Sequence, residues 1–346
     1  MADTQLRDFL ARLMRNENLS RAETLQLLDS LLDGQATDAQ IGAILIALKR
    51  KGETVEELGG LAQGMRARAT RINAKHRRFI DTAGTGSSSA KTFNVSTAAA
   101  FVIAGAGLPV AKHGNRAASS RCGSADVLSA LGVNVSVAAS VSETCLDELG
   151  ICFMFAPLYH GATARVAGLR RELGVQTTFN LLGPLTNPAG APRQIVGVSS
   201  REVVELMAQT LALLGTERAW VVHGEDGLDE ITIAGATLVA EALDGATRTF
   251  EITPEDFGLP RGGLDNLRGG DAAGNAQIIG DVLNGKRHDE ARMLVVINAA
   301  SALHVGGAAS NLREGVRLAN ESIDSGRALE KLNELIRLTN GPKADR

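Results

Sequence analysis

Three segments of the sequence combine residue types that could bind a phosphorylated substrate together with magnesium. The first reads DTAGTGSSSAKTFNVST at residues 81–97 and places glycines and hydroxyls between an apolar run and a helical stretch. Such a turn directs free backbone amides and the positive end of a helix dipole at an anion. The segment is neither a Walker A loop nor a GxGxxG fingerprint. Taken alone, it fits a phosphate cradle and an ordinary connection capped by Ser96 or Thr97 equally well.

The second segment, KHGNRAASSRCGS at residues 112–124, contains three cations, Lys112, Arg116 and Arg121, with two glycines and three hydroxyls. This density of cations suits a highly charged phosphate ester. The alternative, a solvated basic turn, does not explain the glycine and the asparagine that separate the first two cations. Because the segment follows the strand-like residues PVA, it predicts an anion site at the carboxyl end of a strand.

The third segment, HGEDGLDEI at residues 223–231, also follows a strand signal. Its adjacent carboxylates, Asp229 and Glu230, could hold Mg²⁺, which takes oxygen ligands and commonly bridges one or two carboxylates to substrate phosphates. An acidic loop is the better interpretation of this motif when it stands alone. The three segments together, each on a loop after a strand, predict a site for a magnesium-bound sugar pyrophosphate.

Hydrolytic chemistry is disfavoured by the residues that are missing. His113, His160 and His223 could each be core or capping groups, because no GxSxG elbow or HExxH helix accompanies them. The three cysteines form no CxxC pair. They therefore predict reduced, packed thiols and neither a disulfide framework nor a zinc site.

The elements that must position these segments begin with a helical group. Three capping boxes each precede an apolar-periodic run, and they are Ser20 with Glu23, Thr37 with Gln40, and Thr54 with Glu57. The run at residues 41–48 is more apolar than one buried helix face requires. We therefore expect another element or a partner subunit to cover it.

From Phe79 onward, short apolar runs alternate with glycine turns and helical stretches. This alternation predicts a mostly parallel central sheet flanked by helices. Residues 162–182 look helical again and are expected to complete the helical domain. The predicted fold class is α/β plus a small all-helical domain, with boundaries at 1–72, joined by part of about 162–190, and at 73–346.

Three further elements are expected in the second half of the chain. A hairpin should turn at Asp244–Gly245. The apolar stretch at residues 293–302 predicts a buried helix. The Pro–Gly segment at residues 259–270 predicts an exposed loop.

Composition narrows the class of protein further. The sequence is 44% hydrophobic and 22% charged, as in globular proteins. Its formal charge of -3 and its 3% aromatic residues provide neither an overall positive field nor a stacking platform for nucleic acid. The N-terminus lacks a targeting pattern, and no stretch reaches the roughly 20 apolar residues of a membrane helix. We therefore expect a soluble, cytoplasmic protein with no nucleic-acid or membrane partner.

Four blocks of the sequence, in order, closely resemble the anthranilate phosphoribosyltransferases, which join anthranilate to phosphoribosyl pyrophosphate in tryptophan biosynthesis. The blocks are GTG at 84–86 through NVST at 94–97, KHGNR at 112–116 with SS at 119–120, RRELG to NLLGPLTNP over 170–188, and DGLDEI at 226–231. The similarity covers nearly the whole chain. Two alternatives stay open: a pyrimidine nucleoside phosphorylase of the same fold, which shares KHGNR, and a non-catalytic nucleic-acid-binding relative.

The resemblance implies an active site between the two domains and a homodimer formed through the helical domain. It implies that Mg²⁺ is held by Ser96, Asp229 and Glu230, and that no general base is needed. Anthranilate would contact Gly84, Asn115 and Arg170. Phosphoribosyl pyrophosphate would be bound by Gly84, Ser87, Ser88, Thr92, Asn94, Val95, Ser96, Thr97, Lys112, His113, Gly114, Asn115, Arg116, Ala117, Ala118, Ser119, Ser120 and Ser124.

The sequence departs from the family pattern at two places. Many members have GTGGD where this chain has GTGSS, so Ser88 would bind through its hydroxyl where others use a carboxylate. Gly161 and Gly168 stand where members usually carry prolines. These departures concern the path taken by the aromatic acid. They leave the implied reaction unchanged: transfer of the 5-phosphoribosyl group to the amine of anthranilate, with release of pyrophosphate.

Overall fold

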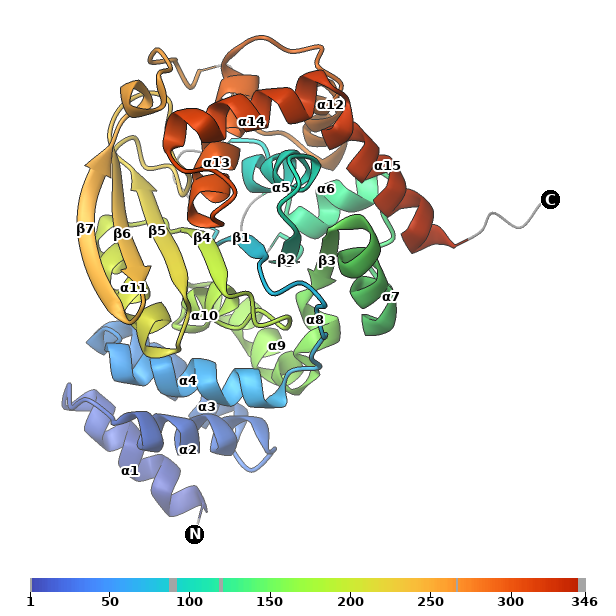
Figure 1. Cartoon of the computed structure of the whole chain (residues 1–346). Coiled ribbons are helices and arrows are strands. Elements are labelled where there is room, and N and C mark those ends of the chain that lie inside the picture. Colours follow the sequence, from blue (N-terminus) through green and yellow to red (C-terminus); the bar gives the residue numbers. More distant parts are fainter. Residues whose placement is uncertain (1, 87–91, 118–120, 266, 342–346) are drawn as a thin grey trace.

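The structure is a computed structural model, and it describes residues 2–86, 92–117, 121–265 and 267–341. Four helices open the chain (Figure 1): α1 (Ala2–Met14), α2 (Arg21–Leu32), α3 (Asp38–Lys51) and α4 (Val55–Arg68). The three predicted capping boxes are confirmed at the starts of α2, α3 and α4. In each, a hydroxyl and a Glu or Gln side chain satisfy backbone amides that the helix leaves free.

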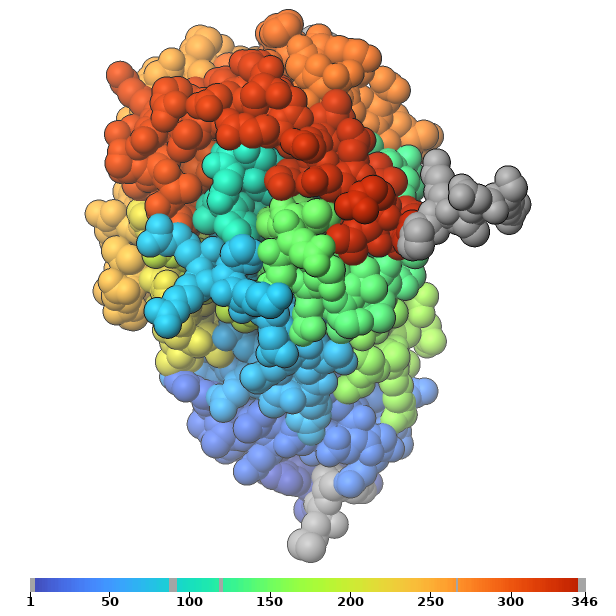
Figure 2. All heavy atoms as spheres, turned by 45° about the vertical axis from the view of Figure 1, so that its right-hand side comes forward, coloured from blue at the N-terminus to red at the C-terminus, as the bar shows by residue number. Residues whose placement is uncertain are grey.

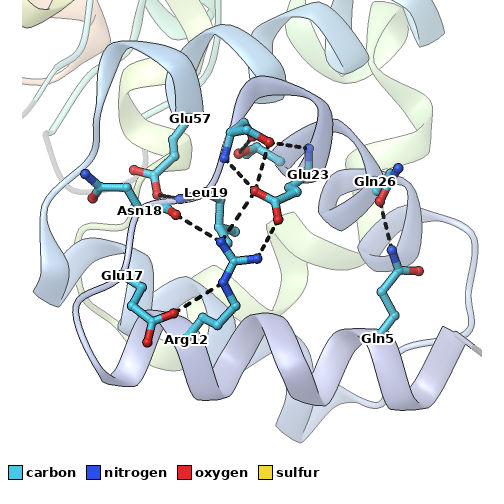
Figure 3. Close-up of polar contacts among 10 residues, drawn as sticks. Gln5, Arg12, Glu17, Asn18, Leu19, Glu23, Gln26 and Glu57 are labelled. Atoms are coloured by element: carbon cyan, nitrogen blue, oxygen red, sulfur yellow. Dashed lines mark hydrogen bonds and ion pairs between the residues drawn. The ribbon is translucent and has the colours of Figure 1, made fainter.

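Polar contacts fix these helices to one another (Figure 3). Arg12 on α1 lies 2.5 Å from a carboxylate oxygen of Glu23 on α2. Glu57 on α4 is buried and accepts a hydrogen bond from the backbone amide of Leu19 at 2.9 Å. Its second oxygen accepts from Lys51 Nζ at 2.8 Å. The buried carboxylate is therefore paired, which burial of a charge requires.

The apolar helix α3 is covered by the chain itself. Ile41, Ile44 and Leu48 are fully buried. Their helix contacts α1 on one side and α9 (Ala164–Leu173) on the other. The expected covering element is thus found within one chain. Helix α9 also contacts α2, and α10 (Phe179–Leu185) contacts α4, which confirms that a later excursion completes the helical domain.

A seven-stranded sheet forms the centre of the second region, in the order β3-β2-β1-β4-β5-β6-β7. Its strands are β1 (Ile80–Gly84), β2 (Val110–Gly114), β3 (Ile151–Phe155), β4 (Arg193–Gly197), β5 (Arg218–Gly224), β6 (Thr237–Leu243) and β7 (Ala246–Ile252). The first five strands are parallel, and β6 and β7 are antiparallel. The predicted hairpin is confirmed, with Asp244 and Gly245 at φ 50° and 82°.

Helices cover both faces of the sheet. Successive residues of β5 point to opposite faces, so Trp220 and Val222 join one buried cluster while Ala219 and Val221 join the other. The first face packs against α5 (Val95–Gly105), α13 (Glu290–Val305) and α15 (Arg327–Asn340), and α12 (Ala272–Leu283) and α14 (Leu312–Asp324) pack in turn on α5 and α13. Helices α10 and α11 (Val204–Leu213) cover the second. Helix α13 is buried around almost its whole circumference, as predicted.

Shorter elements complete the fold. They are α6 (Ser124–Ala130), α7 (Ala139–Thr144), α8 (Ala156–Tyr159), a π-helical turn η1 (Cys145–Leu149), and the short helical turns η2 (Gly161–Thr163), η3 (Arg201–Val203) and η4 (Pro254–Phe257). Figure 2 shows the N-terminal helices at one end of the molecule and the C-terminal helices at the other. None of the described helices is long and apolar enough to cross a membrane. The three cysteines are free and buried, as expected.

Candidate active site

The three predicted segments meet on one side of the sheet, where the parallel strands have their carboxyl ends. Strands β1, β2 and β5 are parallel neighbours or near-neighbours, and each predicted segment leaves the sheet at a strand's carboxyl end. In open α/β sheets, ligands bind in the crevice outside these ends. This side of the sheet is therefore the candidate site.

The first segment leads from β1 into α5. Ser87 and Ser88 lie outside the described residues. Asn94 is the residue before α5 and makes no side-chain capping bond, so the alternative in which Ser96 or Thr97 caps the helix is wrong. Both residues lie in the first helical turn. The turn therefore presents amide groups at the candidate site, and the Ser96 amide donates to Glu230 Oε1 at 3.2 Å.

Lys112, Ser96 and Glu230 come together although they belong to three different segments. Lys112 Nζ donates to the carbonyl oxygen of Thr82 and lies 3.3 Å from Ser96 Oγ. Beside these groups is a cavity of about 10 Å³, room for about one water-sized group. It is lined by Thr82, Ala83, Ser96, Ala99, Ile195, Glu230 and Asn298.

Burial dominates the electrostatics of this cluster. It raises the pKa of Glu230, and the neighbouring Asp229 carboxylate adds to the rise while Lys112 opposes it. Burial also lowers the pKa of Lys112, and Asp81 and Glu230 oppose that shift. The Lys112 ammonium and the Glu230 carboxylate each oppose, without cancelling, the pKa shift that burial imposes on the other.

The Asp229 backbone can come close to the end of β4 because that strand ends in glycine. A Cβ on Gly84 would lie 3.6 Å from Asp229 Oδ2, which is ordinary contact. A Cβ on Gly197, at the end of β4, would lie 1.7 Å from the backbone oxygen of Asp229. Only glycine permits this approach. We did not predict a role for Gly197, and its only signal in the sequence is its place after the apolar run QIV.

The oxygen atoms of Ser96, Asp229 and Glu230 suit Mg²⁺. Two adjacent carboxylates and a hydroxyl are hard ligands of the kind that magnesium shares with substrate phosphates. No cluster of three or more His, Cys, Asp or Glu side chains placed for a metal occurs in the described part of the chain. The donor set therefore fits an ion held jointly by protein and substrate.

Asp126 organises the second segment and was not predicted. Its Oδ2 accepts from the amides of Ala117 at 3.0 Å and Gly123 at 2.9 Å, and its Oδ1 accepts from Arg116 Nη1 at 2.9 Å. These bonds draw both ends of the basic loop to the start of α6. Its signal in the sequence was an acid three residues after Gly123, which is the spacing of a capping box. Ala118, Ser119 and Ser120 lie outside the described residues.

The remaining residues of the second segment pack around its first turn. Gly114 is the last residue of β2. The backbone oxygen of Asn115 accepts from the amide of Ala125 at 3.2 Å and from Ser124 Oγ at 3.3 Å. The Arg116 guanidinium lies 5.6 Å from the centre of the Phe155 ring.

Part of the segment predicted as an exposed loop lies against the candidate site. The described residues of 259–270 form no helix or strand, but Leu267 is buried and its backbone oxygen accepts a hydrogen bond from the Phe93 amide at 3.2 Å. Thr92 forms an isolated β-bridge with Arg268. The prediction is therefore wrong for Leu267 alone among the described residues of this segment, the others being exposed or partly exposed.

Asn94 is held by structural bonds on both sides. Its Nδ2 donates to the backbone oxygen of Cys122 at 3.2 Å, and its Oδ1 accepts from Asn275 Nδ2 at 3.0 Å. Asn275 Oδ1 in turn accepts from the Gly270 amide at 2.8 Å. Asn94 thus links the two predicted anion segments to each other and to α12.

A second group of polar residues lies where β2 meets the helical excursion. His113 donates its backbone amide to Asp81 Oδ1 at 3.1 Å, and its Nδ1 lies 3.1 Å from the Gly183 backbone oxygen. Its ring centre is 5.2 Å from that of His160. Burial lowers the pKa of His113 to about 3, with a smaller contribution from His160. Burial lowers the pKa of His160 as well. Both imidazoles are therefore neutral near pH 7.

Arg170 stands on α9 beside α10. Its Nη2 donates to Asn180 Oδ1 at 2.9 Å, and its guanidinium lies 5.8 Å from the centre of the Phe179 ring. Arg170 Nε is buried and has no hydrogen-bond partner among the described residues. The Nε2 atoms of His113 and His160 are in the same condition. Buried polar atoms are ordinarily paired, so these three nitrogens have hydrogen-bonding capacity left for a ligand or for water.

Comparisons with known proteins agree with this geometry. The sequence matches the family model "Glycosyl transferase family, a/b domain" over residues 76–329 and "Glycosyl transferase family, helical bundle domain" over residues 7–69. Anthranilate phosphoribosyltransferase of Moorella thermoacetica is 52% identical over 94% of this chain and 96% of its own length. The anthranilate phosphoribosyltransferase of Anaeromyxobacter dehalogenans strain 2CP-C is 54% identical over 96% of this chain and 98% of its own length. The chain belongs to the anthranilate phosphoribosyltransferase family.

Solved structures of anthranilate phosphoribosyltransferases share the fold. The crystal structure of the Thermus thermophilus enzyme superposes with a TM-score of 0.91 at 39% identity, covering 96% of this chain and all of the other. The Saccharomyces cerevisiae enzyme in complex with PRPP and Mg gives a TM-score of 0.89 at 29% identity, covering 97% and 98%. The family and the fold class predicted from the sequence are thereby confirmed.

Proposed function

We propose that this chain transfers the 5-phosphoribosyl group from phosphoribosyl pyrophosphate to the amine of anthranilate. The products are N-(5-phosphoribosyl)anthranilate and pyrophosphate, a step of tryptophan biosynthesis. The observation that carries the proposal is the meeting of Lys112, Ser96 and Glu230 on one side of the sheet, in a chain of this family.

The pyrophosphate end of the substrate belongs at the ends of β1, β2 and β5. Ser96, Asp229 and Glu230 would hold Mg²⁺, which supplies positive charge for the leaving pyrophosphate when it is bound. The S. cerevisiae relative was solved in complex with PRPP and Mg, which supports the use of Mg²⁺ with this substrate. The remaining residues assigned to phosphoribosyl pyrophosphate from the sequence lie along the two anion segments, whose amides would hold the phosphates.

Anthranilate belongs on the side of the helical excursion, near Arg170, Asn115 and Gly84. The free Nε of Arg170 supports contact with a carboxylate, since a guanidinium binds that group in a two-point geometry. An aromatic amine is uncharged at pH 7 and already carries its lone pair. It needs orientation more than deprotonation. The neutral state of His113 and His160 agrees with a reaction that uses no general base.

Fluorescence tests the proposal directly. The purified chain is mixed with anthranilate, phosphoribosyl pyrophosphate and Mg²⁺, and loss of anthranilate fluorescence is followed. We expect turnover that a chelator abolishes. We also expect Asp229→Asn with Glu230→Gln to remove it, because the ion loses both carboxylates. Undiminished turnover in the double variant would reject the metal assignment, and cleavage of uridine or thymidine by inorganic phosphate instead would reject the reaction.

The family resemblance also implied a homodimer, and we propose one formed through the first helices. Met14 on α1 and Ile46 on α3 are 57% and 38% exposed, although both are large apolar residues. Helices α1 and α3 lie at the end of the molecule opposite the C-terminal helices (Figures 1 and 2).

A further inference from the structure

Asn298 is a buried amide on an otherwise apolar part of α13. It is 4% exposed, and its flanking residues Ile297 and Ala299 are fully buried. Its Oδ1 accepts from the backbone amide of Ile231 at 3.0 Å. Its Nδ2 donates to the backbone oxygens of Ile231 at 3.0 Å and Leu294 at 2.8 Å. Both hydrogens of the amide nitrogen are therefore used.

The two bonds to Ile231 hold one residue at both its N–H and its C=O. A neighbouring strand would hold a backbone in the same way. Ile231 directly follows Glu230 in the chain, so this contact sets the position and rotation of the backbone that carries the carboxylate. Asn298, Ser96 and Glu230 also line the same cavity.

The opposite side of the carboxylate pair is held by packing. The backbone oxygen of Asp229 lies so close to Gly197 that no Cβ fits between them. The pair Asp229–Glu230 is thus fixed by β4 on one side and by α13 on the other. An apolar residue at position 298 would leave the Ile231 N–H and C=O buried and unpaired, which is costly.

We propose that Asn298 is a positioning residue that orients Glu230 toward the metal and pyrophosphate. The inference rests on the proposed function, because it takes Glu230 as a ligand of Mg²⁺. Residues that orient a metal ligand typically change metal affinity by about 10- to 100-fold when they are replaced. Asn298 does not touch the ion or the substrate in this scheme and acts only through the backbone at Ile231.

Three variants test the proposal in the full chain: Asn298→Ala, Asn298→Asp and the control Ser301→Ala. Ser301 lies one turn along α13, is fully buried, and its Oγ donates to Ile297 O at 3.0 Å within the same helix. Binding of Mn²⁺ is measured by electron paramagnetic resonance with phosphoribosyl pyrophosphate present and anthranilate absent, corrected with a protein-free mixture. The Mg²⁺ concentration for half-maximal turnover and the anthranilate KM are measured in parallel.

We expect Asn298→Ala to raise the Mn²⁺ Kd and the half-saturating Mg²⁺ by about 10- to 100-fold. The anthranilate KM should stay within about twofold, and Ser301→Ala should leave all three values within about twofold. Asn298→Asp keeps the acceptor for the Ile231 amide but loses the donor to its carbonyl. The Mn²⁺ Kd and the half-saturating Mg²⁺ concentration of this variant should lie between those of the wild type and of the alanine variant.

The outcomes distinguish a failure of the positioning role of Asn298 from a failure of the proposed function. A wild-type chain that neither binds Mn²⁺ nor turns over would end both. An active wild type with unchanged metal affinity in Asn298→Ala would overturn the inference and leave the function standing. Thermal melts followed by circular dichroism show whether each variant folds. If the alanine variant is unfolded, the aspartate variant decides; if both are unfolded, Asn298 supports the fold and not the position of Glu230, and the inference is overturned.

Discussion

Arg116 and Arg170 carry the same guanidinium group in different settings. Arg116 is exposed and paired with the Asp126 carboxylate at 2.9 Å. Arg170 is half-buried, donates to the neutral amide of Asn180, and keeps a free Nε among the described residues. Burial lowers its pKa below the ordinary arginine value. Yet an arginine stays charged at pH 7 under such a shift, so Arg170 is prepared to receive an anionic ligand.

Removal of the Arg170 guanidinium should weaken the binding of anthranilate and leave the binding of phosphoribosyl pyrophosphate nearly unchanged. We expect Arg170→Ala to raise the anthranilate KM at least about tenfold. This change corresponds to a loss of roughly 1.4 kcal/mol or more of binding free energy, as expected for a charge-assisted pair. The KM for phosphoribosyl pyrophosphate should stay within about twofold. Steady-state kinetics with each substrate varied in turn measure both values. The exposed neighbour Arg171→Ala is the control, and equal effects of Arg170→Ala on both substrates would contradict the assignment.

Residue types and spacing were enough to find Lys112, Ser96 and Glu230, because each lies within a segment rich in groups of its own kind. They could not reveal Asn298 or Gly197. An asparagine in an apolar helix and a glycine after a strand are common, and their importance comes from the backbone that each one meets. That backbone belongs to a different part of the chain, so the contact cannot be recognised from the sequence and is found only in the folded structure.

Helix α9, which carries Arg170, also contains a glycine whose replacement should change the stability of the helix. Gly168 lies inside the helix, and a Cβ added there would meet no atom within 4 Å. Glycine within a helix is destabilising by roughly 0.5–1 kcal/mol relative to alanine, because it loses more backbone freedom on folding.

We therefore expect Gly168→Ala to raise the free energy of unfolding by about 0.5–1 kcal/mol. Urea denaturation at fixed pH measures the change as a shift in the midpoint at constant slope. Gly174→Ala is the matched opposite, because Gly174 ends the same helix at φ +64°, which strains any other residue. It should lower the midpoint. A neutral or destabilising Gly168→Ala would show that α9 needs its flexibility.

The junction of β2 with α8 should make stability depend on pH. His113 stays neutral in the fold down to its pKa of about 3, whereas an unfolded histidine is protonated below about 6.5. The unfolded state therefore binds more protons between these values. Stability should fall as pH falls through this window, by up to about 1.4 kcal/mol per pH unit for one proton.

Urea unfolding at pH 7 and pH 5 tests this dependence. We expect His113→Gln to show a smaller loss on acidification than the wild type, and the exposed His288→Gln to match the wild type. Asp81 acts in the opposite direction, since burial raises its pKa to about 6 and favours its protonated form in the fold. The comparison of variants isolates the His113 contribution. If His113→Gln loses as much stability between pH 7 and pH 5 as the wild type does, the proposed contribution of His113 would be refuted.

Local signals predicted elements well and long-range pairing poorly. The capping boxes at Ser20, Thr37 and Thr54 and the turn at Asp244–Gly245 act within a few residues, so the sequence shows them directly. The loop at 259–270 looked exposed because glycine and proline mark turns. Leu267 is nevertheless buried, and the backbones of Leu267 and Arg268 pair with those of Phe93 and Thr92, a contact that composition does not record.

At the scale of the whole molecule, the helical group and the sheet share one core. A single buried cluster joins Leu48 of α3 to Val196 of β4 and Val221 of β5. Helix α11 contacts α4 on one side and β5 and β6 on the other. The sequence indicated two regions by their different periodicities. It could not show that apolar residues from both regions are packed together.

The proposed dimer belongs to this scale as well. We expect the wild-type chain to elute with twice the mass of one chain in size-exclusion chromatography with light scattering. Ile46→Glu places a charge on an apolar helix surface and should shift the mass toward that of one chain, because burying an unpaired charge is strongly unfavourable. Leu243→Glu, which changes an exposed apolar residue on the β6–β7 hairpin outside the first helices, should not shift the mass. A monomeric wild type would contradict the proposal.

The backbone clamp between α13 and Ile231 has a consequence for how the protein is made. A ribosome synthesises both anion loops and the acidic pair well before it reaches the helix that carries Asn298. A nascent chain at that stage has its phosphate-binding turns but no amide to steady Glu230. The clamp on the acidic pair is therefore formed only after α13 has been made, later in synthesis than both anion loops.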